Sequence, residues 1–235
     1  MARTIQEYEP VIQMVGVRDA LYARHTCRDF KSAPVPREIV EKILEAALRA
    51  PSTANTQPWE IYVAAGEPLL RLRQAFILNH SKNLPPHPDI PLSHAWPAAL
   101  QKRREEIMAL HQGRQIPHPG ETTEVRDHWK RNFEFFGAPV VIYLCMDKSL
   151  GFWSIFDLGL LSQSVMLEAK EWGLDTAPAL MLVAYPDLIR EELAIPKHLS
   201  VVFGIALGFS DEAGRDSGYL SPRRPLGEAV HFSGF

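Results

Sequence analysis

Hydrophobic positions along the chain alternate between the spacing of helices and the spacing of strands. From residue 37 to residue 48, apolar side chains recur three and four positions apart between charged ones, which predicts an amphipathic helix. The stripe consists of Ile39, Val40, Ile43, Leu44 and Ala47. Pro36 suits the first turn of this helix, and Pro51 disfavours helical geometry in the residue before it. The helix is therefore predicted to end before Pro51.

The same two periods predict the remaining elements. Runs rich in β-branched and aromatic residues predict strands at 59–65, 139–146, 174–183 and 199–209. Helical spacing predicts helices at 69–79, 99–112, 153–173 and 186–195, and another that ends near residue 136. The helix 153–173 is apolar nearly all round, as is typical of a helix buried on several sides, and Gly173 is suited to end it. We expect a single α+β domain over residues 1–235, with a sheet between helices.

Two stretches depart from this regularity. Residues 80–98 contain "NLPPHPDIPLSHAWP", whose five prolines exclude regular structure. The segment 80–120 is either a surface excursion without a role or a lid over a binding site, since long loops on compact domains serve as both. The tail 210–235 has no clear period and is predicted to be a C-terminal extension.

Composition excludes several classes of protein. The chain has 235 residues, 46% of them apolar and 23% charged, and a formal net charge of −3. This balance gives no general attraction to nucleic acid or to an anionic membrane, so any anion site must be local. The longest apolar run, 138–146, is far shorter than the roughly 20 residues that span a bilayer. The N-terminal "MARTIQEYEP" lacks an apolar signal core, so we expect a soluble cytoplasmic protein.

Familiar catalytic motifs are missing. The sequence has no G-x-S-x-G, no H-E-x-x-H, no P-loop and no Cys/His set with zinc spacing, so no metal site is predicted. Cys145 lies in a predicted core strand and is interpreted as a small apolar filler. Cys27 lies beside cationic residues but has no neighbouring base, which argues against a nucleophile. Most histidines lie in or near the Pro-rich excursion and are interpreted as solvated.

Two polar clusters remain as candidates. In "ARHTCRDF" (23–30), guanidinium groups and a hydroxyl have the composition of a phosphate site, although an ordinary solvated loop explains the segment equally well. In "APSTANTQPW" (50–59), short amide and hydroxyl side chains stand between two prolines. Such a loop can present donors and acceptors to a planar heterocycle; ordinary turn chemistry is the alternative.

Read in chain order, these segments carry a resemblance. "RHTCRDF", "PVPREIVEKILEAALRAPSTANTQPWEIYV", the stretch from "NFEFFGAPVV" to "GLDTAPA", and the closing "RRPLGEAVHFSGF" resemble the FMN-dependent nitroreductase family, in its nitrobenzoate-reductase-like branch. The resemblance covers residues 18–235. It implies a three-layer α+β sandwich, with a mostly antiparallel central sheet flanked by helices. It also implies an intertwined homodimer with two FMN molecules at its interface.

The resemblance assigns site residues by position. Those matched to the FMN phosphate and ribityl chain are Arg24, His25, Thr26 and Arg28. Those matched to the loop that contacts the flavin from the other chain are Pro51, Ser52, Thr53 and Asn55. Those matched to the isoalloxazine surroundings are Gln163, Pro178, Ala179 and Leu180.

The tail departs from the branch. Arg223, and less clearly Arg224, remain as phosphate partners, but Gly218 and Leu220 stand where relatives carry arginines. Either FMN binds more weakly here, or Arg24 and Arg28 hold most of the phosphate.

The resemblance also implies a reaction. NAD(P)H delivers hydride to flavin N5 and leaves, and a nitroaromatic, quinone or related acceptor is then reduced on the same face, with no obligate catalytic side chain. The excursion 79–120 is a candidate wall of the acceptor pocket, where Leu92 and Trp96 suit a small aromatic acceptor. The alternatives are a specialised FMN enzyme, such as an ene reductase or a reductive dehalogenase, and a flavin-binding protein with little turnover.

Overall fold

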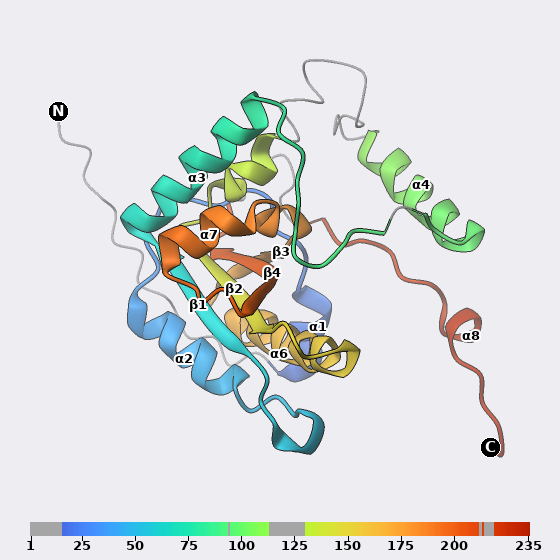
Figure 1. Cartoon of the computed structure of the whole chain (residues 1–235). Helices are drawn as coiled ribbons and strands as arrows, with labels where there is room; N and C mark the ends of the chain where they lie inside the picture. Colours follow the sequence, from blue (N-terminus) through green and yellow to red (C-terminus); the bar gives the residue numbers. More distant parts are fainter. Residues whose placement is uncertain (1–15, 94, 113–129, 212, 214–218) are drawn as a thin grey trace.

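A four-stranded antiparallel sheet forms the centre of the protein (Figure 1). The computed structural model describes residues 16–93, 95–112, 130–211, 213 and 219–235. The strands are β1 (Glu60–Ala65), β2 (Val140–Asp147), β3 (Asp175–Pro178) and β4 (Leu199–Gly208), in the spatial order β1-β2-β4-β3. Each neighbouring pair is antiparallel. The predicted α+β class, with an antiparallel sheet flanked by helices, is confirmed.

Helices cover both faces of the sheet. On one face lie α3 (Gly66–Ser81) and α7 (Pro186–Leu193), and on the other lie α2 (Arg37–Ala47) and α6 (Phe152–Glu171) (Figure 1). Alternate residues of β2 enter the two cores: Tyr143 packs toward α3 and α7, and Ile142 toward α2 and α6. Helix α1 (Val17–Ala23) contacts α6. Helices α4 (Ala98–Gln112) and α8 (Leu226–Ala229) lie outside the three layers (Figure 1).

Two predicted elements are wrong at their C-terminal ends. The predicted strand 174–183 pairs with β4 only as far as Pro178, and the chain then forms the 3₁₀ turn η3 (Leu180–Val183). Proline has no N–H for the ladder, and the next N–H, that of Ala179, bonds to the carbonyl of Gly204 at 3.2 Å as the chain turns. The predicted helix 186–195 ends at Leu193, because Ala194 adopts a left-handed conformation with φ of 52°.

Other boundaries agree more closely with the sequence. Helix α2 begins after Pro36, and Gly173 ends the central helix with φ of 65°, as predicted. Helix α3 begins three residues earlier than predicted, at Gly66. The helix expected to end near residue 136 ends at residue 133, before the 3₁₀ turn η2 (Phe135–Gly137).

The beginning of the Pro-rich excursion packs against the domain. The N–H of His87 donates to the carbonyl of Ala184 at 2.9 Å. The carboxylate of Asp89 pairs with Arg190 and accepts the N–H of Val201 at 2.7 Å. These contacts tie the excursion to α7 and β4 before it reaches α4. Residues 94 and 113–120 of the predicted lid lie outside the described residues.

Gly204 shows how closely η3 lies against the sheet. A Cβ atom placed on Gly204 would lie 2.6 Å from the Cβ of Leu182, a separation that folded proteins do not tolerate. We expect Gly204→Ala to lower the free energy of unfolding by about 1–3 kcal/mol or more. Trimming Leu182 to alanine would not relieve the contact, because the Cβ remains. Thermal unfolding measures the effect, with Gly227→Ala as the control because its added Cβ meets nothing within 4 Å. Equal melting temperatures would contradict this packing.

Candidate functional site

The first polar cluster, residues 24–28, lies along the edge strand β3. The N–H of Cys27 donates to the carbonyl of Thr176 at 2.9 Å, and Thr26 forms a parallel bridge with Thr176. Arg131 donates to the carbonyl of Arg28 and pairs with the carboxylate of Asp29. The backbone of the cluster is therefore fixed from both sides.

The positive charge of this cluster is carried by Arg24 and Arg28. Within the described residues, neither Arg24 nor Arg28 forms an ion pair. Burial lowers the pKa of Arg24, and the nearby charge of Arg223 lowers it further. The charge of Arg223 thus acts on Arg24, although the two are 199 positions apart (223 − 24). Like charges that act on one another in this way fit a bound anion.

His25 turns its imidazole into the protein. Its Nδ1 lies 3.2 Å from the carbonyl of Ala23 and 3.8 Å from the carboxylate of Asp175, which also accepts a bond from Lys170 at 2.7 Å. Its Nε2 is buried and has no partner among the described residues. The Nε2 atom is therefore turned away from solvent in this chain.

The second cluster is a strained loop anchored on α6. It contains the 3₁₀ turn η1 (Thr53–Asn55), and the φ angles of Ala54, Asn55 and Gln57 are positive, at 50°, 57° and 48°. Asp157, which is only 2% exposed, accepts the N–H of Thr53 with both carboxylate oxygens, at 3.3 and 3.1 Å. Pro51 and Asn55 are exposed, so part of the loop is open to a ligand.

The two clusters lie at opposite ends of α6. Asp157 holds the loop near one end, and Lys170 reaches the first cluster through Asp175 at the other. The 13 residues from 157 to 170 rise about 20 Å along the helix. Gln163 lies near the middle of α6 and is partly exposed. The charge of Arg223 thus acts on the first cluster, whereas the loop 51–57 lies apart from it.

The remaining predicted residues follow β3. Pro178 ends that strand, two positions after the residue that pairs with the first cluster, and Ala179 and Leu180 continue from it. The side chain of Leu180 is 53% exposed. These three residues therefore extend away from the first cluster along a surface open to a ligand. Leu220 is exposed, and Gly218 lies outside the described residues.

Residues 21–209 match the model of the nitroreductase family. The chain belongs to the nitroreductase family. It is 33% identical to 4-nitrobenzoate reductase of Pseudomonas putida over 92% of this chain and 96% of that protein. It is 34% identical to nitrobenzene nitroreductase of Ectopseudomonas oleovorans over 84% of this chain and 88% of that protein.

A solved structure of the family has the same fold. The crystal structure of the FMN-dependent nitroreductase NfnB from Mycobacterium smegmatis, in complex with NADPH, matches with a TM-score of 0.87 and 27% identity. The match covers 92% of this chain and 97% of that one. The resemblance read from the sequence is confirmed.

Both cysteines of this nitroreductase-family protein have thiols of low expected reactivity. Both thiols are buried, and burial raises the pKa of Cys27 to about 12. The thiol of Cys27 also donates to the carbonyl of Asp29. Because the thiolate is the reactive form, we expect an aromatic disulfide reagent at pH 8 to modify neither thiol rapidly in the folded protein, and both after denaturation. Rapid modification of Cys27 in the folded protein would contradict its burial.

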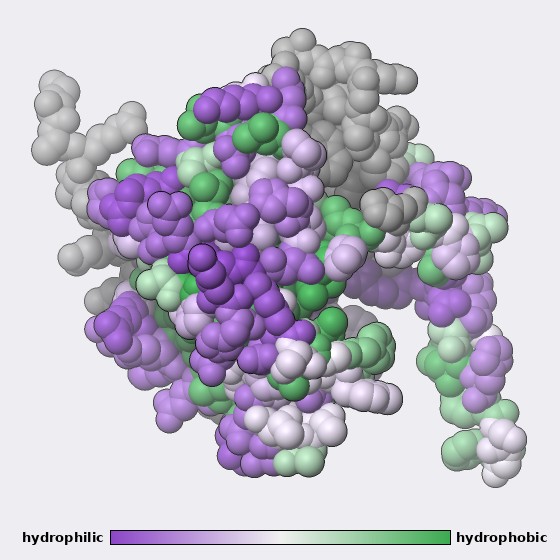
Figure 2. Space-filling model, viewed as in Figure 1, coloured by the Kyte–Doolittle hydropathy of each residue, from purple (hydrophilic) through white to green (hydrophobic). Residues whose placement is uncertain are grey.

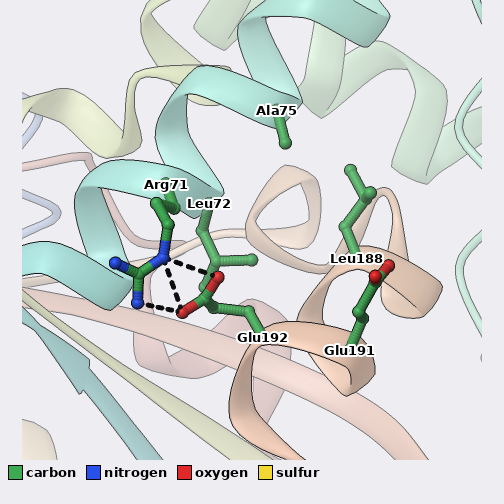
Figure 3. A pocket seen from close by; sticks show the side chains of 6 residues that line it. All are labelled: Arg71, Leu72, Ala75, Leu188, Glu191 and Glu192. Carbon is green, nitrogen blue, oxygen red and sulfur yellow. Dashed lines mark hydrogen bonds and ion pairs between the residues drawn. The ribbon is translucent and has the colours of Figure 1, made fainter.

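A surface pocket lies elsewhere, between α3 and α7 (Figure 3). It has a volume of about 410 Å³ and is lined by Arg71, Leu72, Ala75, Leu188, Glu191 and Glu192. Arg71 and Glu192 form a forked ion pair within it, with a shortest distance of 2.7 Å. None of the predicted site residues lines this pocket, so it is separate from the candidate site.

The described residues contain neither a cluster suited to a metal ion nor a helix suited to cross a membrane. No group of three or more His, Cys, Asp or Glu side chains there is arranged to hold a metal ion. None of the helices in that part of the chain has the length and apolar character needed to cross a membrane.

Proposed function

We propose that the protein is an FMN-dependent NAD(P)H oxidoreductase that reduces nitroaromatic compounds. The observation that carries the proposal is the pair of guanidinium groups at Arg24 and Arg28, which lack a carboxylate partner in the described chain, with the charge of Arg223 acting on Arg24. Two relatives that share about a third of the sequence are named for nitroaromatic reduction, and the NfnB structure is titled FMN-dependent and contains NADPH.

The residues of the first cluster fit an FMN phosphate. The phosphate is a dianion, and the cluster offers cations and the hydroxyl of Thr26 on a backbone fixed by Thr176 and Arg131. A charge-assisted bond of this kind contributes about 1.5–3 kcal/mol. Pro178, Ala179 and Leu180 continue from the strand beside this cluster, which suits contact with the ring system of the same FMN.

We further propose that the site is completed by a second copy of the chain. Because the two clusters lie at opposite ends of α6, one chain does not bring them together. A two-fold dimer that packs two α6 helices antiparallel exchanges their ends. The loop 51–57 of one protomer then lies beside residues 24–28 of its partner, and Gln163 lies near the axis.

Uncovered apolar surface supports this dimer. At the start of α6, the side chains of Phe152 and Phe156 are 73% and 53% exposed, so the chain itself does not bury the apolar helix on all sides. The tail 219–235 runs away from the sandwich in Figure 1, and hydrophobic side chains stand out along it at the right of Figure 2. Leu226 and Phe232 in this tail are largely exposed. An extended apolar tail of this kind can pack against a partner subunit, as it would in an intertwined homodimer.

When bound, FMN supplies the hydride-transfer chemistry between NAD(P)H and the acceptor, and the protein supplies binding and position. Arg24, Arg28 and Arg223 bind the phosphate end, and Asn55 of the partner's loop contacts the flavin. The described part of the excursion 79–120, residues 79–93 and 95–112, forms part of the wall of the acceptor pocket in this proposal. There Trp96 is exposed, with the guanidinium of Arg104 5.4 Å from its ring centre.

The test is the absorbance spectrum of the purified protein, followed by anaerobic addition of NADH or NADPH and then of 4-nitrobenzoate. We expect a flavin spectrum, its bleaching by the nicotinamide and its recovery with the nitro compound. A colourless protein that does not bind added FMN would overturn the proposal. Bound FMN without acceptor-dependent turnover would instead favour a flavin-binding protein.

A further inference from the structure

We propose that Asp157 is a positioning residue, which holds the loop 51–57 so that Asn55 meets the flavin. The inference rests on the proposed function. Asp157 lies in the second turn of α6, is 2% exposed, and reaches a loop 104 residues earlier in the chain. It faces the loop from inside the protein and does not itself reach the ligand surface.

The loop needs such an anchor because its backbone is strained. Positive φ angles at three non-glycine residues within four positions each carry a conformational cost, which persists only where surrounding contacts impose it. Asp157 supplies contacts from outside the loop: it accepts the N–H of Thr53, and its Oδ1 accepts the hydroxyl of Thr53 at 3.4 Å. A contact within the loop also stabilises its backbone: Ser52 Oγ accepts the N–H of Gln57 at 2.9 Å.

These contacts divide the polar residues of the loop into two groups. The hydroxyls of Ser52 and Thr53 are engaged within the protein, and Gln57 Nε2 donates to the carbonyl of Asn55 at 3.3 Å. The side-chain amide of Asn55 has no hydrogen bond to another described residue, and the residue is exposed. Asn55 and Thr56 are therefore the polar side chains of the loop that remain available to a ligand. Asn55 is the one that the family resemblance assigns to the flavin, and its direction depends on the anchor at Thr53.

A carboxylate suits this task better than an amide. Asp157 has no cationic partner within the described chain. Among the described residues, its carboxylate oxygens accept hydrogen bonds from the N–H and hydroxyl of Thr53. Both of its oxygens accept bonds from that one residue. An asparagine at 157 would offer one acceptor oxygen and would turn a donor toward another donor.

The test combines FMN affinity with a double-mutant cycle. Dissociation constants are measured by quenching of FMN fluorescence for wild type, Asp157→Ala, Asn55→Ala and the double variant. We expect Asp157→Ala to weaken FMN binding about tenfold or more, and Asp157→Asn to weaken it less. If Asp157 acts through Asn55, its replacement adds little once Asn55 is gone. Fully additive effects, or unchanged affinity in Asp157→Ala, would overturn the proposal.

A second readout separates this inference from the proposed function. Hydrogen exchange of the Thr53 amide, measured without FMN, is expected to accelerate strongly in both Asp157 variants, and unchanged exchange overturns the anchor. If wild type does not bind FMN while the amide is protected as expected, the proposed function fails and the anchor stands. Asp147→Ala is the control, because Asp147 accepts the N–H and hydroxyl of Ser149 at 2.8 and 2.6 Å. It should leave both FMN affinity and Thr53 exchange unchanged.

Discussion

Replacing Arg24 and Arg28 together with alanine is expected to raise the dissociation constant for FMN by about two to four orders of magnitude. Each guanidinium contributes about 1.5–3 kcal/mol through charge-assisted bonds to the phosphate, and each 1.4 kcal/mol is a factor of ten. The fold should remain intact, because the cluster is held by its backbone contacts with Thr176 and Arg131 rather than by the two side chains. Fluorescence titration of the apoprotein with FMN measures the change.

The control for this experiment is the pair Arg37→Ala and Arg71→Ala. It removes the same formal charge, but these guanidinium groups already have partners, Glu41 and Glu192, in exposed ion pairs. We expect little change in FMN affinity. If both double variants weakened FMN binding equally, the effect would come from the overall charge of the protein. The assignment of the phosphate to residues 24–28 would then fail.

Replacing Phe152 and Phe156 with aspartate is expected to convert the protein to monomers and abolish tight FMN binding at the same time. Burying each phenylalanine in an interface contributes about 1.5–3 kcal/mol, and two-fold symmetry doubles the number of side chains involved. The aspartates would also place carboxylates without cationic partners in an apolar interface, which is costly. Light scattering gives the mass, and the flavin spectrum gives the occupancy.

Leu78→Asp serves as the matched control. Leu78 lies on α3 and is 51% exposed, on the opposite face of the sheet from α6. It should change neither mass nor FMN content. A monomeric Phe152/Phe156 variant that still binds FMN tightly would show that one chain completes the site alone.

Most of the fold could be predicted from local sequence. The stripe of α2, the apolar run of β2 and the helix-ending Gly173 each reflect interactions within a few residues, and the structure has them where the pattern places them. The strand predicted through residue 183 shows the limit. An apolar run does not reveal that Pro178 ends the ladder, or that η3 then packs against Gly204, because the packing partner lies far along the chain.

The candidate site was predictable only in part, because its local segments show in the sequence and its long-range contacts do not. The two clusters were visible as polar segments, but the residues that fix them were not. Asp157 lies 104 residues from Thr53, and Arg131 lies 103 from Arg28. No local spacing links such pairs. The inward orientation of His25 was also hidden, since it depends on Asp175 of β3. The signal that pointed to Asp157 was an acidic residue among the apolar side chains in the first half of α6.

The C-terminal tail lacks two expected arginines but contributes Arg223, whose charge acts on Arg24. Gly218 and Leu220 stand where arginines were expected, yet Arg223 lies close enough to Arg24 to affect its pKa. We therefore expect Arg24, Arg28 and Arg223 to neutralise most of the negative charge of the FMN phosphate in this protein.

The central claim is that each FMN site takes residues 24–28 from one chain and the loop 51–57 from its partner. The most direct test coexpresses an Arg24→Ala/Arg28→Ala chain with an Asp157→Ala/Asn55→Ala chain under different tags, and isolates the mixed dimer. With shared sites, one of its two sites combines both lesions and the other is wild type. We predict one tightly bound FMN per mixed dimer and none in either homodimer. A mixed dimer without tightly bound FMN would contradict the account.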